Sequence, residues 1–282
     1  MIHVTKKNKS AIQRRLIPTY IFLIIVSFIS VFPLYWMISA ATNTSTDVSR
    51  GRIIPGSHFM ENFRNLTSQQ PLWRALGNSF FYAILTTVIC LLICSIAGYG
   101  FEVYHDKWKD RVFSILLLAM MVPQVATMVP LFKMFSKAGL LNTAVGFILP
   151  IISTPFMIMM FRQNARSFPV DIIEAARIDG LNEVRIFFQM FIPTMKSTYA
   201  AAAVITFMNA WNSYLWPKVI MTDNKAMTMP MLIANLITGY VTDYGMLMCG
   251  VLFCSIPTMI VFFVLQKQFA EGITCLLYTS PS

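Results

Sequence analysis

The 282-residue chain is much richer in apolar residues, and poorer in charged ones, than a soluble domain. Hydrophobic residues make up 56% of it and charged residues 12%, whereas about a quarter of the residues of an ordinary globular domain are charged. The formal net charge of +10 is spread over several segments, unlike the basic face with interleaved aromatics that binds nucleic acid. This composition excludes a soluble domain and a nucleic-acid partner, and it predicts an all-α protein of the lipid bilayer.

Six apolar stretches are long enough to cross the hydrocarbon core of a membrane, which needs about 20 residues of helix. They are predicted at about residues 17–40, 77–101, 112–135, 144–162, 198–221 and 245–265. Residues 1–16 then form an N-terminal segment, and residues 17–274 form a membrane domain. The even number of spans places both termini on the same side.

The basic residues predict which side that is. Several precede the first span without any acidic residue among them, and others follow the second span: Lys6, Lys7, Lys9, Arg14, Arg15, then Lys107, Lys109 and Arg111. Short loops rich in Lys and Arg stay in the cytoplasm, so both termini are predicted to be cytoplasmic. The first span exceeds the apolar core of about 7 to 15 residues in a cleaved signal peptide, so we expect it to remain as a membrane helix.

Prolines interrupt several of the predicted spans. The third span contains Pro123 and Pro130, the fourth Pro150 and Pro155, and the sixth Pro257. Each proline removes a backbone hydrogen bond and bends or breaks a helix. These bends suit either a bundle that changes conformation or ordinary packing between membrane helices.

The fifth predicted span is the most polar one. Three hydrogen-bonding side chains lie in it beside three aromatic residues: Asn209, Asn212 and Ser213 with Trp211, Tyr214 and Trp216. Polar groups in a membrane helix face the interior of the bundle, because an unpaired amide in hydrocarbon costs several kcal/mol, on the order of 4 or more. They either line a pathway for a small hydroxylated solute or hold helices together, and the span by itself is compatible with both.

The sequence contains no recognisable catalytic or metal-binding cluster. The cysteines lack CxxC spacing and a nearby histidine pair, the three histidines lie in different polar segments, and there is no GxxxxGK[ST] phosphate loop. We therefore predict no catalytic residue, no metal site and no cofactor on this chain.

Residues 167–197 form a charged island between the fourth and fifth spans. Pro169, Asp171 and Gly180 predict a short helix at 169–179, since proline and acidic residues favour the first turn of a helix and glycine its end. Asn182 can cap a second helix. Two such helices at the membrane surface serve either as a lever that contacts a soluble partner or as a plain connector.

A motif within this island resembles a known family. Residues 174–176 read EAA, followed by Gly180 and then by Ile192 and Pro193. This pattern is similar to the cytoplasmic-loop signature of permeases of binding-protein-dependent ABC importers. The stretch EAARIDGLNEVRIFFQMFIPTMKS is similar to the carbohydrate-type branch, which includes the G permease of maltose-type uptake systems. WNSYLWP in the fifth span and QKQFAEGIT near the C-terminus also fit, so the resemblance covers about residues 12–274.

The resemblance implies a transporter subunit of the bacterial cell membrane that is not itself an enzyme. Its partners would be a second homologous permease, two ABC ATPase subunits, an extracytoplasmic solute-binding protein and a sugar. The helix with the EAA sequence would insert into a cleft of the ATPase and couple its motion to the pathway. The residues implied in coupling are Glu174, Ala175, Ala176, Arg177, Asp179, Gly180 and Pro193, and those assigned to the pathway are Asn209, Trp211, Asn212 and Tyr214.

Two other function classes compete with this hypothesis. An ion-coupled secondary transporter could have six spans and broken helices, but the spans lack a strong buried carboxylate for the coupling ion. A membrane-bound enzyme would need a catalytic cluster. The C-terminal residues 275–282, CLLYTSPS, depart from the family pattern and are predicted to be a non-native tail.

Overall fold

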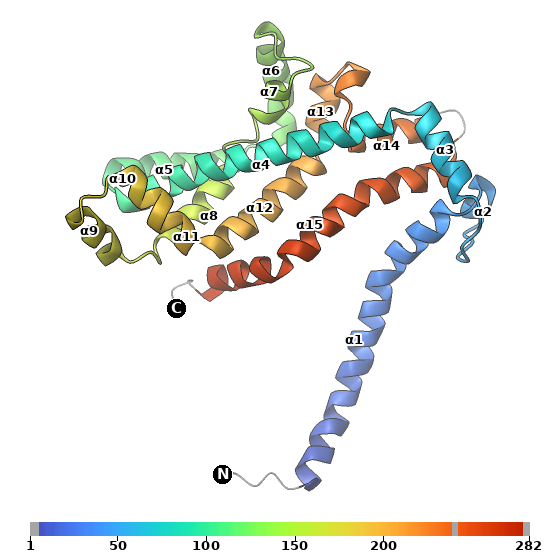
Figure 1. The fold of residues 1–282 in the computed structure, drawn as a ribbon, viewed down its shortest axis with the longest axis horizontal. Coiled ribbons are helices and arrows are strands. Elements are labelled where there is room, and N and C mark those ends of the chain that lie inside the picture. The colour runs from blue at the N-terminus through green and yellow to red at the C-terminus, as the bar shows by residue number, and fades with distance from the viewer. Residues whose placement is uncertain (1–5, 239–241, 279–282) are drawn as a thin grey trace. The chain divides into compact units, whose positions relative to one another are not determined.

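In the computed structural model, residues 6–238 and 242–278 are described, and they form helices joined by turns, with no β-strand among them (Figure 1). The predicted all-α class is thus confirmed for these residues. The predicted tail at 275–282 lies partly outside the described residues, as do residues 1–5 of the N-terminal segment. The helices are α1 (Lys6–Ala41), α2 (Ser45–Ser49), α3 (Phe59–Gln69), α4 (Leu72–Val103), α5 (Lys107–Ala119), α6 (Gln124–Lys137), α7 (Ala144–Ile148), α8 (Pro155–Ala165), α9 (Val170–Ile178), α10 (Glu183–Ile186), a π-helix (Phe187–Phe191), α11 (Ile192–Thr194), α12 (Lys196–Trp211), α13 (Leu215–Ile220), a 3₁₀-helix (Asn224–Ala226), α14 (Met229–Ile237) and α15 (Tyr244–Tyr278).

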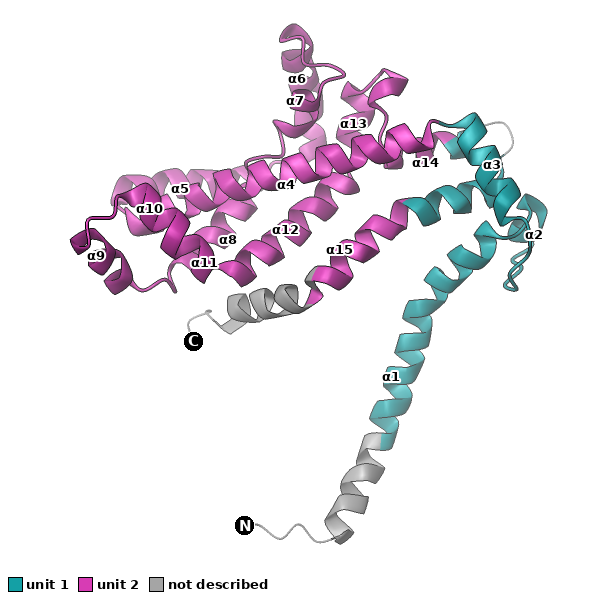
Figure 2. Ribbon diagram, viewed as in Figure 1, with its two compact units in different colours: residues 1–70, 236–253 teal, residues 71–235, 254–282 magenta. Residues whose placement is uncertain are grey.

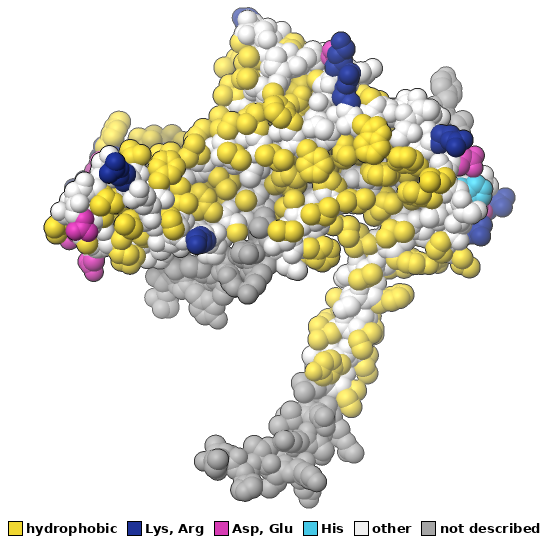
Figure 3. Space-filling view, viewed as in Figure 1, with side chains coloured by type: hydrophobic (Ala, Val, Ile, Leu, Met, Phe, Trp, Pro, Cys, Tyr) yellow, Lys and Arg dark blue, Asp and Glu magenta, His cyan; other side chains and the backbone are white. Residues whose placement is uncertain are grey.

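The chain divides into two compact units, which are coloured separately in Figure 2. The first unit, residues 1–70 and 236–253, contains α1 to α3 and the start of α15. Asn62 of α3 donates hydrogen bonds of 2.9 Å to the carbonyl oxygens of Ala41 and Asn43, at the end of α1. Most large apolar side chains of α1 between residues 17 and 35 are exposed, and Figure 3 shows them along this helix. Such a surface suits contact with lipid tails or with another membrane helix.

The second unit, residues 71–235 and 254–282, is built around α4, against which α8 and α12 pack. Small residues allow close approach at these contacts, since a Cβ atom on Gly98 of α4 would lie 2.6 Å from Cβ of Phe161 in α8. The buried core between the three helices comprises Cys90, Cys94, Met157, Ile158, Met160, Phe161, Ala201 and Ala202. The cysteines thus pack as small apolar residues.

Three helices are long and apolar enough to cross a membrane within the described part of the chain: Ile17–Ala41, Leu72–Val103 and Tyr244–Val264. A fourth crossing is added if α5 and α6, which meet at an angle of 101°, count as one bent span. The predicted spans 112–135, 144–162 and 198–221 are all interrupted, between α5 and α6, α7 and α8, and α12 and α13. Prolines 123, 150 and 155 lie at the first two interruptions, where they remove backbone hydrogen bonds.

Candidate functional site

The first helix of the charged island, α9, ends in a tight glycine turn. Gly180 has a φ of +79°, a conformation that costs other L-residues roughly 1–2 kcal/mol. Its N–H donates to the carbonyl of Arg177 at 3.1 Å, and the N–H of Leu181 donates to that of Ala176 at 3.0 Å. These two bonds form a Schellman cap. The glycine therefore ends α9, as the sequence predicts, and reverses the chain toward α10.

The second helix of the island, predicted from its cap at Asn182, is not a regular α-helix throughout. The side chain of Asn182 accepts a bond of 2.9 Å from the N–H of Arg185 and so caps α10, as expected. After Ile186, however, the chain forms a π-helix over Phe187–Phe191 and resumes an α-helical turn at Ile192–Thr194. Pro193 cannot donate a backbone hydrogen bond to the preceding turn, and the regular helix is interrupted directly before it.

Among the residues assigned to coupling, one is buried and the others are exposed. Ala176 packs into an apolar core with Tyr99 of α4, while Glu174, Ala175, Arg177, Asp179, Gly180 and Pro193 lie at the surface. Ile178 shares the face of Glu174 and Ala175, since residues three and four apart are neighbours on a helix. Its side chain is 86% exposed. Ile178 was not predicted as a site residue, although an apolar residue next to a helix end within a charged segment is a signal for one.

Arg177 makes a contact within the island. Its Nε lies 2.7 Å from Oε1 of Glu183, and the hydroxyl of Tyr104 donates to the other carboxylate oxygen of Glu183. Arg177, and to a smaller extent Tyr104, hold the pKa of the Glu183 carboxyl below its usual range. The carboxylate is therefore ionised above the ordinary glutamate pKa of about 4.3, and the contact weakens only as the pH falls below that value. This contact joins α9, α10 and the residue that follows α4.

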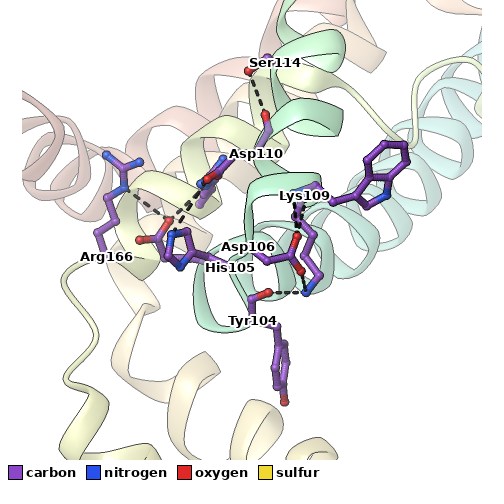
Figure 4. A network of polar contacts seen from close by, with 10 residues as sticks. Tyr104, His105, Asp106, Lys109, Asp110, Ser114 and Arg166 are labelled. Atoms are coloured by element: carbon purple, nitrogen blue, oxygen red, sulfur yellow. Dashed lines mark hydrogen bonds and ion pairs between the residues drawn. The ribbon is translucent and has the colours of Figure 1, made fainter.

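A second polar network surrounds Arg162 at the end of α8. Its guanidinium is 7% exposed and lies 3.1 Å from Oε2 of Glu102 and 2.6 Å from Oδ1 of Asp110. It also stacks over the ring of Phe113, 4.3 Å from the ring centre. Arg166 approaches Glu102 at 3.4 Å, and Figure 4 shows Arg166 and Asp110 within this network. We call Glu102, Asp110, Arg162 and Arg166 the arginine cluster.

The arginine cluster was not predicted. No local pattern connects Arg162 and Arg166 with their acidic partners, which lie 52 to 64 residues away along the chain. Removing one partner of a buried ion pair costs about 3–5 kcal/mol, because the remaining charge is left without compensation. Arg162 therefore needs its carboxylates in place for the fold of this end of the bundle.

A cavity of about 750 Å³ lies where three pairs of helices are interrupted. Its lining comes from the breaks between α5 and α6, α7 and α8, and α12 and α13. The lining residues carry no charged side chain: Ala119, Val122, Gln124, Thr127, Pro150, Ile151, Thr154, Pro155, Asn209, Asn212, Ser213, Tyr214, Leu215 and Trp216. The cavity is thus bordered by neutral polar groups, apolar surface and two aromatic rings.

Three of the four residues assigned to the pathway line this cavity. Asn209, Asn212 and Tyr214 do so, and neither asparagine amide has a hydrogen-bond partner among the described residues. Trp211 does not line it. Its ring is buried against Phe80 and Phe207, and its Nε1 donates to the carbonyl of Cys254 at 3.0 Å. Trp211 therefore joins α12 to α15.

No group of three or more metal-ligating side chains occurs within the described residues. The free thiols of Cys90 and Cys94, 3.7 Å apart, are buried in α4. The chemistry of the cavity is accordingly that of hydrogen bonding and apolar contact.

Over most of its length the chain is similar to membrane components of bacterial transport systems. The family model of the binding-protein-dependent transport system inner membrane component matches residues 91–274. The chain is 40% identical to the lactose transport system permease protein LacG of Rhizobium radiobacter, covering 93% of this chain and 97% of LacG. It is 36% identical to the arabinooligosaccharides transport system permease protein AraQ of Halalkalibacterium halodurans, covering 88% and 91%. Its fold is similar to that of a chain of a bacterial ABC transporter involved in the import of the acidic polysaccharide alginate, with a TM-score of 0.81, 20% identity, and coverage of 95% of this chain and 100% of that chain.

Proposed function

Because the chain belongs to the family of binding-protein-dependent transport system inner membrane components, we propose that it forms half of the pathway of an ATP-driven sugar importer. It is a multi-pass protein of the bacterial inner membrane and a transport permease subunit rather than an enzyme. The names of LacG and AraQ, which refer to lactose and arabinooligosaccharides, support a sugar or oligosaccharide as its solute. Its proposed partners are a second homologous permease, two ATPase subunits and an external solute-binding protein.

The cavity at the interrupted helices is the proposed position of the solute. Its volume of about 750 Å³ lies within the range of small-molecule sites, roughly 300–1,000 Å³. Interrupted membrane helices expose backbone carbonyl and N–H groups, and transporters place such breaks at their solute sites. Asn209, Asn212 and Gln124 add neutral donors and acceptors. A lining without charge suits a neutral, hydroxylated solute such as a sugar, and it offers no carboxylate for the coupling ion of a secondary transporter.

The outward face of α9 is the proposed docking site of an ATPase subunit. The observation that carries this proposal is the exposure of the Ile178 side chain, which is 86%. Ile178 lies beside Glu174 and Ala175 on the face of α9 opposite to the one that packs into the protein. The buried face packs Ile173 and Ala176 into the core around Phe191 and Tyr99. An apolar residue presented in this way, between charged neighbours, fits the core and rim of a protein interface.

Charge reversal at Glu174 tests this docking site. Glu174→Lys is expected to lower solute uptake roughly 30-fold, which corresponds to the 2 kcal/mol or more of an interface hot spot. The protein should remain in the membrane, since Glu174 is exposed. The measurement is uptake of radiolabelled lactose and arabinotriose by cells that express the complete importer, normalised to permease in the membrane fraction.

Glu61→Lys is the matched control, because Glu61 is exposed in the first turn of α3 and belongs to the other unit. Uptake by Glu174→Lys at the level of this control would refute the docking site. Wild-type uptake that survives ATP depletion and stops with an ionophore would favour the ion-coupled transporter instead.

We also propose that the chain crosses the membrane six times, with both termini in the cytoplasm. Each interrupted pair, α5 with α6, α7 with α8 and α12 with α13, then accounts for one crossing. Support comes from the positions of Lys107 and Lys109 in the first turn of α5 and of Arg162 and Arg166 at the end of α8, as the positive-inside rule requires of cytoplasmic ends.

Cysteine labelling tests this topology in a variant whose native cysteines are replaced. Lys225→Cys should react with a membrane-impermeant maleimide in intact spheroplasts, because its loop follows the fifth crossing. Arg185→Cys should react only after permeabilisation, and both positions are exposed. Labelling of Arg185→Cys in intact spheroplasts would exclude the proposed orientation.

A further inference from the structure

The end of α4 is held from two directions by polar contacts. Glu102, in its last turn, accepts hydrogen bonds from Arg162 of α8 at 3.1 Å and from Arg166 at 3.4 Å. Tyr104, two residues further on, donates its hydroxyl to Glu183 of α10. The stretch 102–104 therefore connects the helix before the charged island with a helix inside it.

Close packing surrounds the same stretch. A Cβ atom on Gly98 would lie 2.7 Å from the backbone N of Arg162, so α4 and α8 touch at their backbones one turn before Glu102. The ring centre of Tyr99 lies 4.8 Å from that of Phe191 and 5.4 Å from that of Phe187. Apolar contact of this kind is non-directional and leaves sliding between helices open. The guanidinium of Arg162, by contrast, makes one charge-assisted hydrogen bond to each of two carboxylates and so fixes their register.

The helices on either side of the island both lead to the cavity. α8 lines the cavity with Pro155 and carries Arg162 seven residues, or about two turns, later. α12 begins at Lys196, within the last residues of the island, and ends next to Asn212 in the cavity lining. A displacement of the island is transmitted to both helices together when the island does not shift against α4 and α8.

We propose that Arg162 and Tyr104 are positioning residues that make the charged island, α8 and the end of α4 move as one body, so that motion at α9 reaches the cavity. This inference rests on the proposed coupling role of α9. Arg162 secures α8 to α4 and, through Asp110, to α5. Tyr104 secures α10 to α4, and Arg177 extends this contact to α9 through Glu183.

The charges of the arginine cluster agree with a mechanical role. Two carboxylates, Glu102 and Asp110, face two guanidinium groups, Arg162 and Arg166. His105 lies 4.0 Å from Asp110 at the exposed edge. The positive charge is balanced within the cluster, so these arginines are engaged in joining helices rather than poised for an anionic ligand.

Two conservative substitutions test the proposal. Arg162→Lys keeps the charge but cannot reach both carboxylates as a fork, and Tyr104→Phe keeps the ring but loses the bond to Glu183. In proteoliposomes with the complete importer and its solute-binding protein, the double variant should hydrolyse ATP at close to the wild-type rate. Uptake of lactose or arabinotriose per ATP should fall about tenfold, as for a typical coupling energy between sites. Hydrogen exchange across residues 170–195 should also accelerate.

Arg111→Lys and Tyr35→Phe are the controls, since Arg111 is exposed in α5 and lies outside the arginine cluster, and Tyr35 is exposed in α1. Both controls should keep the wild-type ratio of uptake to ATP hydrolysis. The same ratio in the double variant Arg162→Lys, Tyr104→Phe would overturn the proposal. An equal loss of ATP hydrolysis, uptake and assembled complex would also overturn it, because such a loss indicates a purely structural role. Normal transport by Glu174→Lys would refute the proposed coupling role of α9. Loss of uptake in Glu174→Lys together with normal coupling in the double variant would refute only the positioning role of Arg162 and Tyr104.

Discussion

We expect that replacing Gly180 with proline abolishes solute uptake and leaves the protein in the membrane. Proline restricts φ to about −65°, whereas Gly180 has a φ of +79°, so the turn after α9 cannot form. The substitution also removes the N–H that bonds to Arg177 at 3.1 Å. The Arg177–Glu183 ion pair, which spans this turn, is lost with it. Proline at a position with an incompatible φ and a bonded N–H destabilises the local structure by more than about 1 kcal/mol.

Gly180→Asn is the matched control, because asparagine tolerates the left-handed conformation better than other residues with a side chain. A Cβ atom at this position meets no atom within 4 Å, so we expect nearly normal uptake. Uptake is measured as for Glu174→Lys, with membrane insertion followed by quantitative immunoblotting. Full uptake by Gly180→Pro would show that the geometry of this turn does not matter for transport.

We expect that replacing both Asn209 and Asn212 with leucine slows transport about tenfold through lost hydrogen bonds, each worth roughly 0.5–1.5 kcal/mol. Both side-chain amides line the cavity without a partner among the described residues, and leucine has the same branched shape as asparagine. Each substitution removes a donor and an acceptor for solute hydroxyls. The measurement is the maximal uptake rate per assembled complex.

Asn65→Leu in α3, outside the cavity and in the other unit, is the control for a polar-to-apolar change. The competing interpretation of these asparagines, as contacts between helices, makes a different prediction. In that case the double variant would assemble poorly and the complexes that form would transport at the normal rate.

Local signals were sufficient for the helices of the charged island. Pro169, Gly180 and Asn182 predict a first helix at 169–179 and a cap at 182, and α9 spans Val170–Ile178 with Asn182 capping α10. These signals act within one or two turns of the chain, so they need no tertiary partner. The motif of residues 174–193 also identified the family, which the comparisons confirm.

Signals that depend on distant residues were missed. The pairing of Arg162 with Glu102 and Asp110 was not predicted, because these residues are adjacent to it only in the folded bundle. Trp211 was assigned to the pathway with Asn209 and Asn212, but its ring turns to Phe80 and Phe207. A span that is interrupted after residue 211 presents its neighbouring side chains in directions that a regular helical period does not predict.

The membrane class, the family and the charged island could be predicted from the sequence, because composition, hydropathy and short motifs depend on neighbouring residues. The folded structure was needed to see that three interrupted helix pairs border one cavity, that Arg162 joins α8 to α4 and that Tyr104 joins the island to α4. A helix break costs hydrogen bonds wherever it occurs. Where its free ends point, and which distant charge meets a buried guanidinium, depends on how the helices pack.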